Sequence, residues 1–320
     1  MDEFVWVDGE RTIRFSKRAA EHAWEGSELL TTARAQAGIP PELLARFSNV
    51  HHVPPGQVPD AAAALAQHVS ADRLTAWGGG RVIDTAKAIA SARGGAVCAV
   101  PTTLSGAEMS RGHRTLPGEE QKPRCRPQLV LAAPQLMASA PQQELRDSAM
   151  NALGHAAEAL HVPSRNPVAT LAGLQAAALL ADGIDRGLRD ELALGSVLAG
   201  YALDATELSL HHVVCQTVVR ICGTGHAATN AVMLPHTAAF IAESSPEPMA
   251  ELAAALGVEP AGLEHRLAAL GGLPRRLRDL GVTLEQLGEV SAAAAQRSEL
   301  SRLDPVPTAD QLLQLLERAW

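Results

Sequence analysis

The side chains best suited to chemistry in this chain of 320 residues are histidines in its second half. Asn151 and His155 are four residues apart, which places both on one face of a helix, and His211, His212 and His226 follow much later. Imidazoles bind divalent metals and transfer protons near pH 7. A single histidine on an alanine-rich helix is more often structural. Several of them near breaks in helical segments favour a polar functional site.

The neighbours of these histidines leave the chemistry of the site open. Gln216 is four residues after His212 and shares its helical face, whereas Glu158 follows His155 closely. An amide and three imidazoles would leave the charge of a bound metal uncompensated, so the metal is one interpretation and a metal-free site is the other. An amide such as Gln216 also cannot act as a general acid near pH 7.

A glycine turn in the first half is typical of a phosphate site. Trp77 ends a short apolar run and is followed by Gly78, Gly79 and Gly80, after which a helix begins. Glycines allow the backbone to approach a ligand closely, and the free N–H groups of a helix start attract a pyrophosphate. The spacing differs from the usual GxGxxG pattern, so a tight turn without a ligand is the alternative.

Hydroxyl side chains follow the next apolar run. Thr102, Thr103 and Ser105 come directly after the predicted strand 96–100, and ligands of open α/β sheets bind at the carboxyl ends of the strands. The alternative is a helix start in which Ser105 and Glu108 form a capping box.

The elements that must position these residues fall into two parts. Strands are predicted at 27–32, 73–77, 96–100 and 128–132, helices at 59–68 and 82–91, and a loop at 50–59. Strands alternating with helices predict a parallel sheet covered on both faces. From 145 onwards nearly every segment has helical periodicity. We therefore expect an α/β nucleotide-binding domain at residues 1–138 and a helical domain carrying the histidines at 139–320.

Composition excludes several classes of function. The formal charge is −8 and aromatic residues are 3% of the chain, which disfavours nucleic acid and anionic membranes as partners. No apolar run of about 20 residues predicts a membrane span, no signal peptide is visible, and the four cysteines form no pairing framework. We expect a cytoplasmic protein.

Four segments in this order resemble the iron-containing alcohol dehydrogenases, and the maleylacetate reductase branch most of all. They are GGGRVIDTAKAIA, PTTLSGAEMS, NALGHAAEAL with HVPSRNP, and LHHVVCQ with GTGHAATNAVMLPH. The resemblance covers nearly the whole chain. It implies the dehydroquinate synthase-like fold, in which an N-terminal α/β nucleotide-binding domain precedes an all-α C-terminal domain, and a homodimer.

The resemblance also implies roles for particular residues. The cofactor, NADH or NADPH, would contact the three glycines, Asp84 and the three hydroxyl residues, namely Gly78, Gly79, Gly80, Asp84, Thr102, Thr103 and Ser105. A divalent metal, Fe or Zn, would bind Asn151, His155, His212 and His226, with Asn in place of the family's Asp. Gln216 replaces the histidine that the family uses for proton transfer, so His155, His211 or His212, or a bound water, would take over that role.

Three functions remain open at this point. The first is reduction of an unsaturated oxo-acid, or a related carbonyl compound, by NADH or NADPH. The stretch 111–126, rich in Arg and Lys, could bind the carboxylate of such a small-molecule substrate, although a solvated loop is the alternative. The second function is a non-redox elimination or cyclisation in a biosynthetic pathway. The third is nucleotide binding without catalysis.

Overall fold

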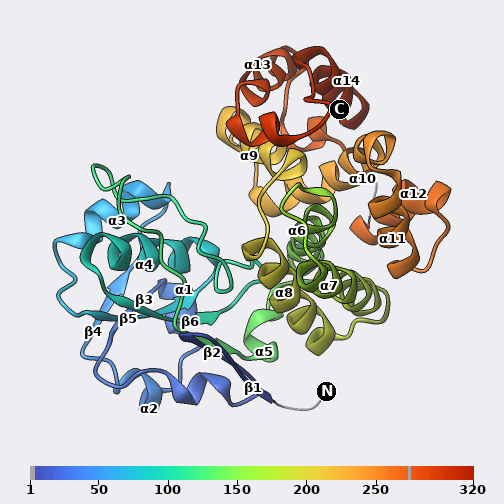
Figure 1. Cartoon of the computed structure of the whole chain (residues 1–320). Helices are drawn as coiled ribbons and strands as arrows, with labels where there is room; N and C mark the ends of the chain where they lie inside the picture. Colours follow the sequence, from blue (N-terminus) through green and yellow to red (C-terminus); the bar gives the residue numbers. More distant parts are fainter. Residues whose placement is uncertain (1–3, 273–274) are drawn as a thin grey trace. The chain divides into compact units, whose positions relative to one another are not determined.

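The computed structural model describes residues 4–272 and 275–320, and it divides into two compact units, Met1–Ala140 and Pro141–Trp320. Figure 1 shows the helices and strands of both units.

The first unit is built on one seven-stranded sheet with the order β1-β2-β7-β6-β5-β3-β4. β1 and β2 pair antiparallel and all other neighbours pair parallel. The strands are β1 (Phe4–Asp8), β2 (Arg11–Phe15), β3 (Glu28–Thr31), β4 (Asn49–His52), β5 (Arg73–Gly78), β6 (Ala96–Pro101) and β7 (Leu129–Ala132). Its helices are α1 (Ala33–Gln36), α2 (Pro41–Leu44), α3 (Val58–Ala66), α4 (Gly80–Arg93) and α5 (Pro134–Met137).

Both faces of this sheet are buried, as the sequence predicts. Leu30, Ala76 and Ala99 contribute to one apolar cluster together with residues of α3 and α4, whereas their strand neighbours Trp77 and Cys98 contribute to a second cluster on the other face. Successive residues of a strand point to opposite faces, so two clusters require cover on both sides. The fold class expected from the sequence is thereby confirmed.

Two parts of the sheet differ from the sequence-based expectation. The segment 50–59 was expected to be a loop, but residues 49–52 form the edge strand β4. Three of its four residues are polar and only His51 is buried, so the segment lacks the apolar run of a central strand. The antiparallel pair β1 and β2 was not predicted at all.

The second unit is helical in every described segment of regular structure. Its α-helices are α6 (Gln142–His161), α7 (Pro167–Arg186), α8 (Arg189–Asp204), α9 (Leu210–Cys222), α10 (His226–Ser244), α11 (Pro246–Ala255), α12 (Leu263–Gly271), α13 (Leu284–Ala295) and α14 (Ala309–Ala319). α6 packs against α7, α8 and α10 and is the central helix of the unit. The sequence GGLP at 271–274 also predicts a break between helices, and its residues 273 and 274 lie outside the described range.

One helix of this unit is long and apolar enough to cross a membrane by length and composition. It is α7, in which 44% of the most apolar window is buried inside the unit. A core helix of a water-soluble protein passes the same test, and α7 packs against both α6 and α8. We therefore interpret it as a packing helix that leaves Val168 and Leu171 exposed.

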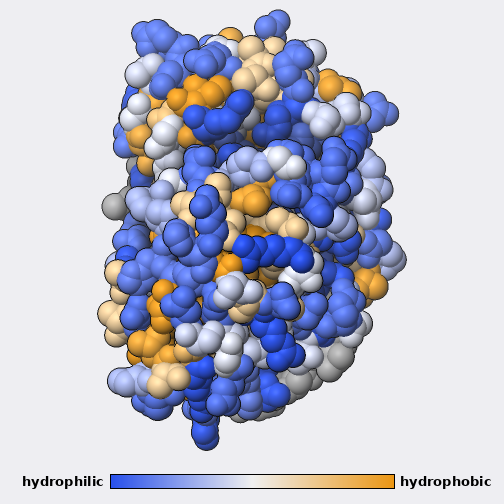
Figure 2. All heavy atoms as spheres, turned by 90° about the vertical axis from the view of Figure 1, so that its left-hand side faces the viewer, coloured by the Kyte–Doolittle hydropathy of each residue, from blue (hydrophilic) through white to orange (hydrophobic). Residues whose placement is uncertain are grey.

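The surface drawn in Figure 2 is mainly hydrophilic, and its hydrophobic residues lie in small separate groups. A surface of this kind agrees with a chain in which 19% of the residues are charged. Scattered apolar side chains are ordinary on soluble proteins and do not by themselves mark a binding surface.

Candidate active site

The glycine turn lies between β5 and α4 and is held against the loop that follows β6. Gly78 ends β5, Gly79 is the N-cap of α4, and Gly80 is the first residue of that helix. A Cβ atom on Gly79 would lie 3.1 Å from Thr103 Cγ2, and one on Gly80 would lie 3.1 Å from Ser105 Cβ. The structure therefore brings the predicted glycines and hydroxyl residues together in one place, where side chains on the glycines would crowd the hydroxyl residues.

Polar atoms near this turn are available to a ligand. Thr102 N donates to Gly78 O at 3.0 Å, which joins the ends of β5 and β6. Thr103 Oγ1 is buried and has no hydrogen-bond partner in the part of the chain that is described. No side chain caps the start of α4. An uncapped helix start beside an unpaired hydroxyl is suited to a phosphate group.

Asp84, predicted to contact the cofactor, is paired within the unit. Its Oδ1 accepts a hydrogen bond from Lys87 Nζ at 2.7 Å. Lys87 is fully buried and also donates to Ala107 O at 3.0 Å and Gly112 O at 2.7 Å. Asp84 thus shares a lysine that anchors the loop after β6, and direct contact with the cofactor remains a prediction.

That loop is anchored by a second cation and contains a buried acid. Arg11 is fully buried and donates to Met109 O. Both carboxyl oxygens of Glu108 are buried without a hydrogen-bond partner among the described residues. Burial raises the pKa of Glu108 to about 7, against the opposing charge of Lys87. The capping-box alternative for Ser105 and Glu108 is wrong, because residues 106–109 form a turn and no helix starts there.

The basic stretch 111–126 lies mostly at the surface of the first unit. Arg114 is exposed and donates to Gln57 Oε1 at 3.0 Å, and Arg126 pairs with Glu10 at 3.4 Å. Lys122 and Arg124 are exposed. These contacts favour the solvated-loop interpretation over a carboxylate site.

In the second unit, three histidines meet where α9 begins beside the middle of α6. Gly154 makes this approach possible, since a Cβ atom there would lie 2.6 Å from His211 Nε2. The rings of His155 and His212 stack with their centroids 4.5 Å apart, and the His211 ring meets His212 edge-on at 4.9 Å. All three side chains are at least 96% buried. The helical spacing and the break before α9 thus produce one cluster from sequence segments more than 50 residues apart.

Hydrogen bonds fix two of these rings. His212 Nδ1 lies 2.7 Å from Glu158 Oε2, and His212 N donates to Glu158 Oε1 at 3.0 Å. His211 Nδ1 lies 2.9 Å from Thr237 Oγ1 on α10. Because Thr237 Oγ1 is also placed to donate to the carbonyls of Met233 and Leu234, it is best used as an acceptor for His211.

Burial keeps the rings of the cluster neutral. It lowers the pKa of His211 and of His212 to about 3, with further lowering by His212 and His226 respectively. Burial likewise holds the pKa of His155 well below its ordinary value. Burial raises the pKa of Glu158, which the nearby histidines and the N–H groups of His212 and Ser209 oppose. A neutral imidazole has one bare nitrogen, which can accept a hydrogen bond or bind a metal.

The other predicted residues of this site take different positions. Asn151 is buried on α6 and its Oδ1 has no partner within the described chain. His226 is exposed at the start of α10, close enough to affect the pKa of His155 and His212. Gln216, one turn after His212, accepts a hydrogen bond from Arg297 at 3.2 Å. The same Arg297 also forms an ion pair with Glu299, so the amide of Gln216 is already hydrogen-bonded.

The residues predicted to bind a metal suit one by chemistry but not by arrangement. Asn151 Oδ1, His155 Nδ1 and His212 Nε2 are buried without hydrogen-bond partners in the described residues, and such lone pairs are metal ligands. However, the rings of His155 and His212 stack face to face, and no three His, Cys, Asp or Glu side chains within the described ranges gather round one point. The present arrangement does not fit a metal, and no step below is routed through one.

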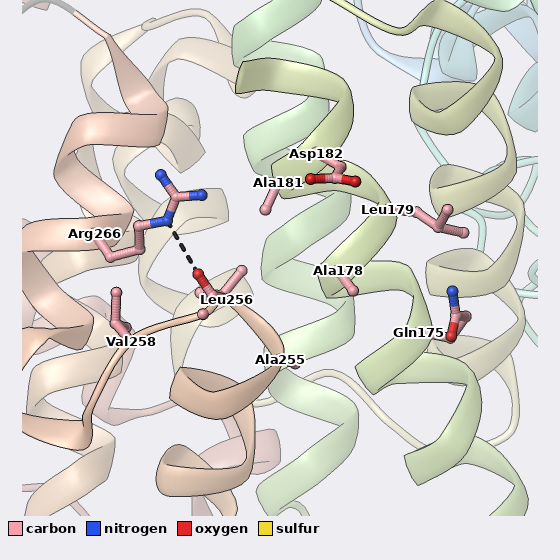
Figure 3. A pocket seen from close by; sticks show the side chains of 10 residues that line it. Gln175, Ala178, Leu179, Ala181, Asp182, Ala255, Leu256, Val258 and Arg266 are labelled. Atoms are coloured by element: carbon pink, nitrogen blue, oxygen red, sulfur yellow. Dashed lines mark hydrogen bonds between the residues drawn. The ribbon is translucent and has the colours of Figure 1, made fainter. Parts of the chain in front are cut away.

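One cavity of the second unit contains none of these residues. It measures about 610 Å³ and is lined by residues of α7, by Arg266 on α12 and by the segment 255–258 (Figure 3). Arg266 donates to Leu256 O at 3.2 Å and pairs with Asp185 at 2.5 Å. With its one lining cation engaged in this way, the cavity offers no alternative active site.

Sequence reasoning gave no role to three residues that the structure makes prominent. Lys87 lies inside the segment GGGRVIDTAKAIA, but only the structure shows that it is buried and donates to the carbonyls of the loop after β6. Thr237 has no sequence signal linking it to His211. Glu158 is three residues after His155, a helical spacing that could have marked it as a partner, yet its contact is with α9 and not with α6.

Comparison with known proteins agrees with both units. The family model described as "Iron-containing alcohol dehydrogenase" matches residues 26–133. The model described as "Fe-containing alcohol dehydrogenase family, C-terminal" matches residues 146–320. Maleylacetate reductase of Sphingobium indicum is 32% identical, over 98% of this chain and 94% of its own length. Maleylacetate reductase 2 of Cupriavidus pinatubonensis is 36% identical over 69% of this chain, which spans 65% of that relative.

A solved structure shows the same architecture. Maleylacetate reductase from Agrobacterium tumefaciens superposes with a TM-score of 0.83 at 26% identity, covering 100% of this chain and 99% of that one. The first unit has a sheet buried on both faces and a glycine turn, and the helical unit has a buried histidine cluster. Together with these relatives, the two units define a nicotinamide-dependent oxidoreductase. The chain belongs to the iron-containing alcohol dehydrogenase family. These comparisons give no support to the non-redox alternative.

Proposed function

We propose that this enzyme reduces an unsaturated oxo-acid of the maleylacetate class with NADH or NADPH. The observation that carries the proposal is the buried cluster of neutral histidines with bare ring nitrogens, in a chain whose relatives are named maleylacetate reductases. The cofactor would be held in the first unit by the start of α4 and by Thr102, Thr103 and Ser105.

The reduced nicotinamide, when bound, supplies the hydride. The chain's own residues then have two tasks. In the first unit, the glycine turn and the uncapped start of α4 bind the pyrophosphate. In the second unit, a proton passes through Nε2 of His212 to the substrate carbon that becomes nucleophilic as hydride reaches the conjugated carbon. Because burial lowers the pKa of His212 to about 3, the ring is neutral at rest and holds this proton only during the transfer. The carboxylate of Glu158 stabilises the imidazolium that forms in between.

A cofactor titration tests the first task. Trp77 is 2% exposed and directly precedes the glycine turn, so binding should change its fluorescence. We expect NADH or NADPH to bind with a micromolar dissociation constant. Gly79→Val should abolish binding, because its side chain would meet Thr103. Gly94→Asn at the other end of α4 should not, since Asn tolerates the left-handed conformation found there.

A turnover assay tests the second task. Maleylacetate should oxidise the bound cofactor. The loss of nicotinamide absorbance measures this reaction, and the metal content is measured on the same sample. Failure of both cofactors to bind, with or without added zinc or iron, contradicts the reductase. Binding without turnover of any unsaturated oxo-acid contradicts the substrate class only.

The remaining properties belong to the same proposal. We propose that the substrate is a carboxylic acid, that the cytoplasm is its compartment, and that two copies form a homodimer. Sedimentation of the purified enzyme at several concentrations tests whether it forms a homodimer. Substrate analogues in which an amide replaces the carboxylate test whether the substrate must be a carboxylic acid.

A further inference from the structure

One buried acidic side chain of the first unit takes no part in the proposed mechanism. Glu108 lies in the loop 102–113, which follows β6, and it has no exposed surface. Neither of its carboxyl oxygens has a hydrogen-bond partner within the part of the chain that is described. A carboxylate that loses water and gains no donor is costly, so this environment favours the neutral acid.

Lys87 on α4 is one of two buried cations whose charges reach Glu108, and all of its donors are engaged elsewhere. It donates to the main-chain carbonyls of Ala107 and Gly112 at 3.0 and 2.7 Å. Its third bond is to Asp84 Oδ1 at 2.7 Å. An ammonium group has three N–H donors, so Lys87 can bond to Glu108 only by releasing one of these partners.

Arg11 on β2 holds the loop on the other side of Glu108. It is fully buried and donates to the main-chain carbonyl of Met109, whereas Lys87 holds that of Ala107. The carbonyls of both sequence neighbours of Glu108 are thus tied to a buried cation. Neither cation bonds to the carboxyl group where it now lies. An ionised Glu108 would therefore gain a charged donor only by drawing one of them away from its present position.

The charges around Glu108 come from two elements, namely Lys87 and Asp84 on α4 and Arg11 on β2. Burial raises the pKa of Glu108, and Asp84 raises it further, whereas its own main-chain N–H, Lys87 and Arg11 act in the opposite direction. His113 lies in the same loop, and burial lowers the pKa of its ring below the ordinary value of 6.5. His113 is therefore neutral where Glu108 loses its proton.

The loop 102–113 also forms one wall of the proposed cofactor site. A Cβ atom on Gly80, the first residue of α4, would lie 3.1 Å from Ser105 Cβ and 3.7 Å from Ala107 Cβ. Ala107 is also the residue whose carbonyl Lys87 holds. Loss of that bond would therefore release the segment that contacts the start of α4.

We propose that Glu108 is a pH-sensitive switch for the cofactor site. While the side chain is neutral, Lys87 and Arg11 hold the loop 102–113 against the start of α4. When it loses its proton to solvent, the carboxylate competes with the main-chain carbonyls for these two cations, the loop is released, and the affinity for the reduced cofactor falls. The proposal rests on the proposed function in one respect, namely that the start of α4 binds NADH or NADPH.

A cofactor titration at two pH values tests the switch. We expect the dissociation constant of the wild type, followed by tryptophan fluorescence, to rise roughly 10-fold between about pH 6 and about pH 8.5, because the bound state holds one proton more tightly. Glu108→Gln cannot ionise, so its dissociation constant should change less than about twofold. The matched control is Glu120→Gln, which removes an exposed carboxylate just after the loop and should keep the wild-type response.

Two further measurements need no cofactor. Carbon-13 NMR should show a glutamate carboxyl group with a pKa near 7 in the wild type, and this group should be absent from Glu108→Gln. Hydrogen exchange reports opening of the loop. The main-chain amides of 102–113 should exchange faster in the wild type than in Glu108→Gln at about pH 8.5, and equally fast at about pH 6.

Three results would overturn the proposal. They are a wild type without a glutamate that titrates near pH 7, a wild-type dissociation constant that does not change with pH, and a Glu108→Gln variant that keeps the wild-type response. The first two need no variant, so they decide even if the substitution prevents folding. Absence of cofactor binding would defeat the proposed function, whereas the carboxyl titration and the amide exchange would still decide whether Glu108 controls the loop.

Discussion

The two candidate sites of this enzyme are built from different materials. The glycine turn consists of backbone and small hydroxyl residues from two neighbouring strand ends, and all of it falls between residues 77 and 105. The histidine cluster consists of side chains from α6 and α9, which lie far apart in sequence. The first site depends on what is missing, namely Cβ atoms, and the second depends on which ring nitrogen carries a proton. Substitutions should therefore affect cofactor binding in one unit and the chemical step in the other.

The largest effect is expected at the histidine cluster. His212→Ala should lower kcat about 1,000-fold, because general acid–base catalysis typically contributes ~10²–10⁴-fold. The dissociation constant for the reduced cofactor should stay near the wild-type value. Steady-state kinetics and a fluorescence titration on the same variant measure both. Weakened cofactor binding in this variant would show that the histidine cluster also contributes to cofactor binding, and would contradict the comparison.

The next effect concerns the anchored loop of the first unit. Lys87→Met should lower the free energy of unfolding by about 2–4 kcal/mol, since it leaves the buried carbonyl of Ala107 without its donor and also removes the bond to the carbonyl of Gly112. Urea denaturation followed by tryptophan fluorescence measures this. Cofactor affinity should fall with it, because the same loop carries Thr103 and Ser105. An unchanged stability would show that other donors replace the lysine.

A pair of glycine substitutions compares the sites directly. A Cβ atom would lie 2.7 Å from Val82 Cγ2 in Gly78→Ala and 2.6 Å from His211 Nε2 in Gly154→Ala. Overpacking of this kind costs ~1–3 kcal/mol. We expect Gly78→Ala to weaken cofactor binding about 10-fold with little change in kcat at saturation, and Gly154→Ala to show the reverse. The same kinetic response in both variants would contradict the division of labour.

The smallest effect is a dependence of stability on pH. Burial raises the pKa of Glu108 from its ordinary value of 4.5 to about 7, so the folded protein binds more protons than the unfolded chain in this interval. Its contribution to stability is thus fully present below about pH 4.5 and is lost as pH rises through 7. Glu108→Gln should remove about 1–3 kcal/mol of this decline between pH 5 and 8. Denaturation curves at several pH values compare the variant with the wild type.

The buried histidines contribute with the opposite sign. Their pKa values are lowered on folding, so the stability they contribute is present above about pH 6.5 and is lost as pH falls toward 3. The two units should therefore respond to pH in opposite directions. Acid should weaken the helical unit, whereas mild alkali should weaken the region around Glu108.

Much of the fold could be predicted from the sequence because the signals are local. The central strands are apolar runs that end at a glycine or a proline, and the helices between them have apolar residues at helical spacing. The edge strand β4 was missed because an exposed strand such as Asn49–His52 need not be apolar. β1 and β2 were missed because the pair joins the sheet through β2 and β7, whose residues are distant in sequence.

The candidate sites divide in the same way. The sequence alone determined the family, the glycine turn, the hydroxyl residues after β6 and the identity of the histidines, since each is a matter of residue type and short spacing. Only the tertiary structure decided that Glu158 reaches across to His212, that Lys87 and Arg11 anchor one loop, and that Gln216 turns to Arg297. Hydrogen bonds act over about 3 Å, whereas these partners are separated by 20 to nearly 100 residues of chain, so no local pattern could have paired them.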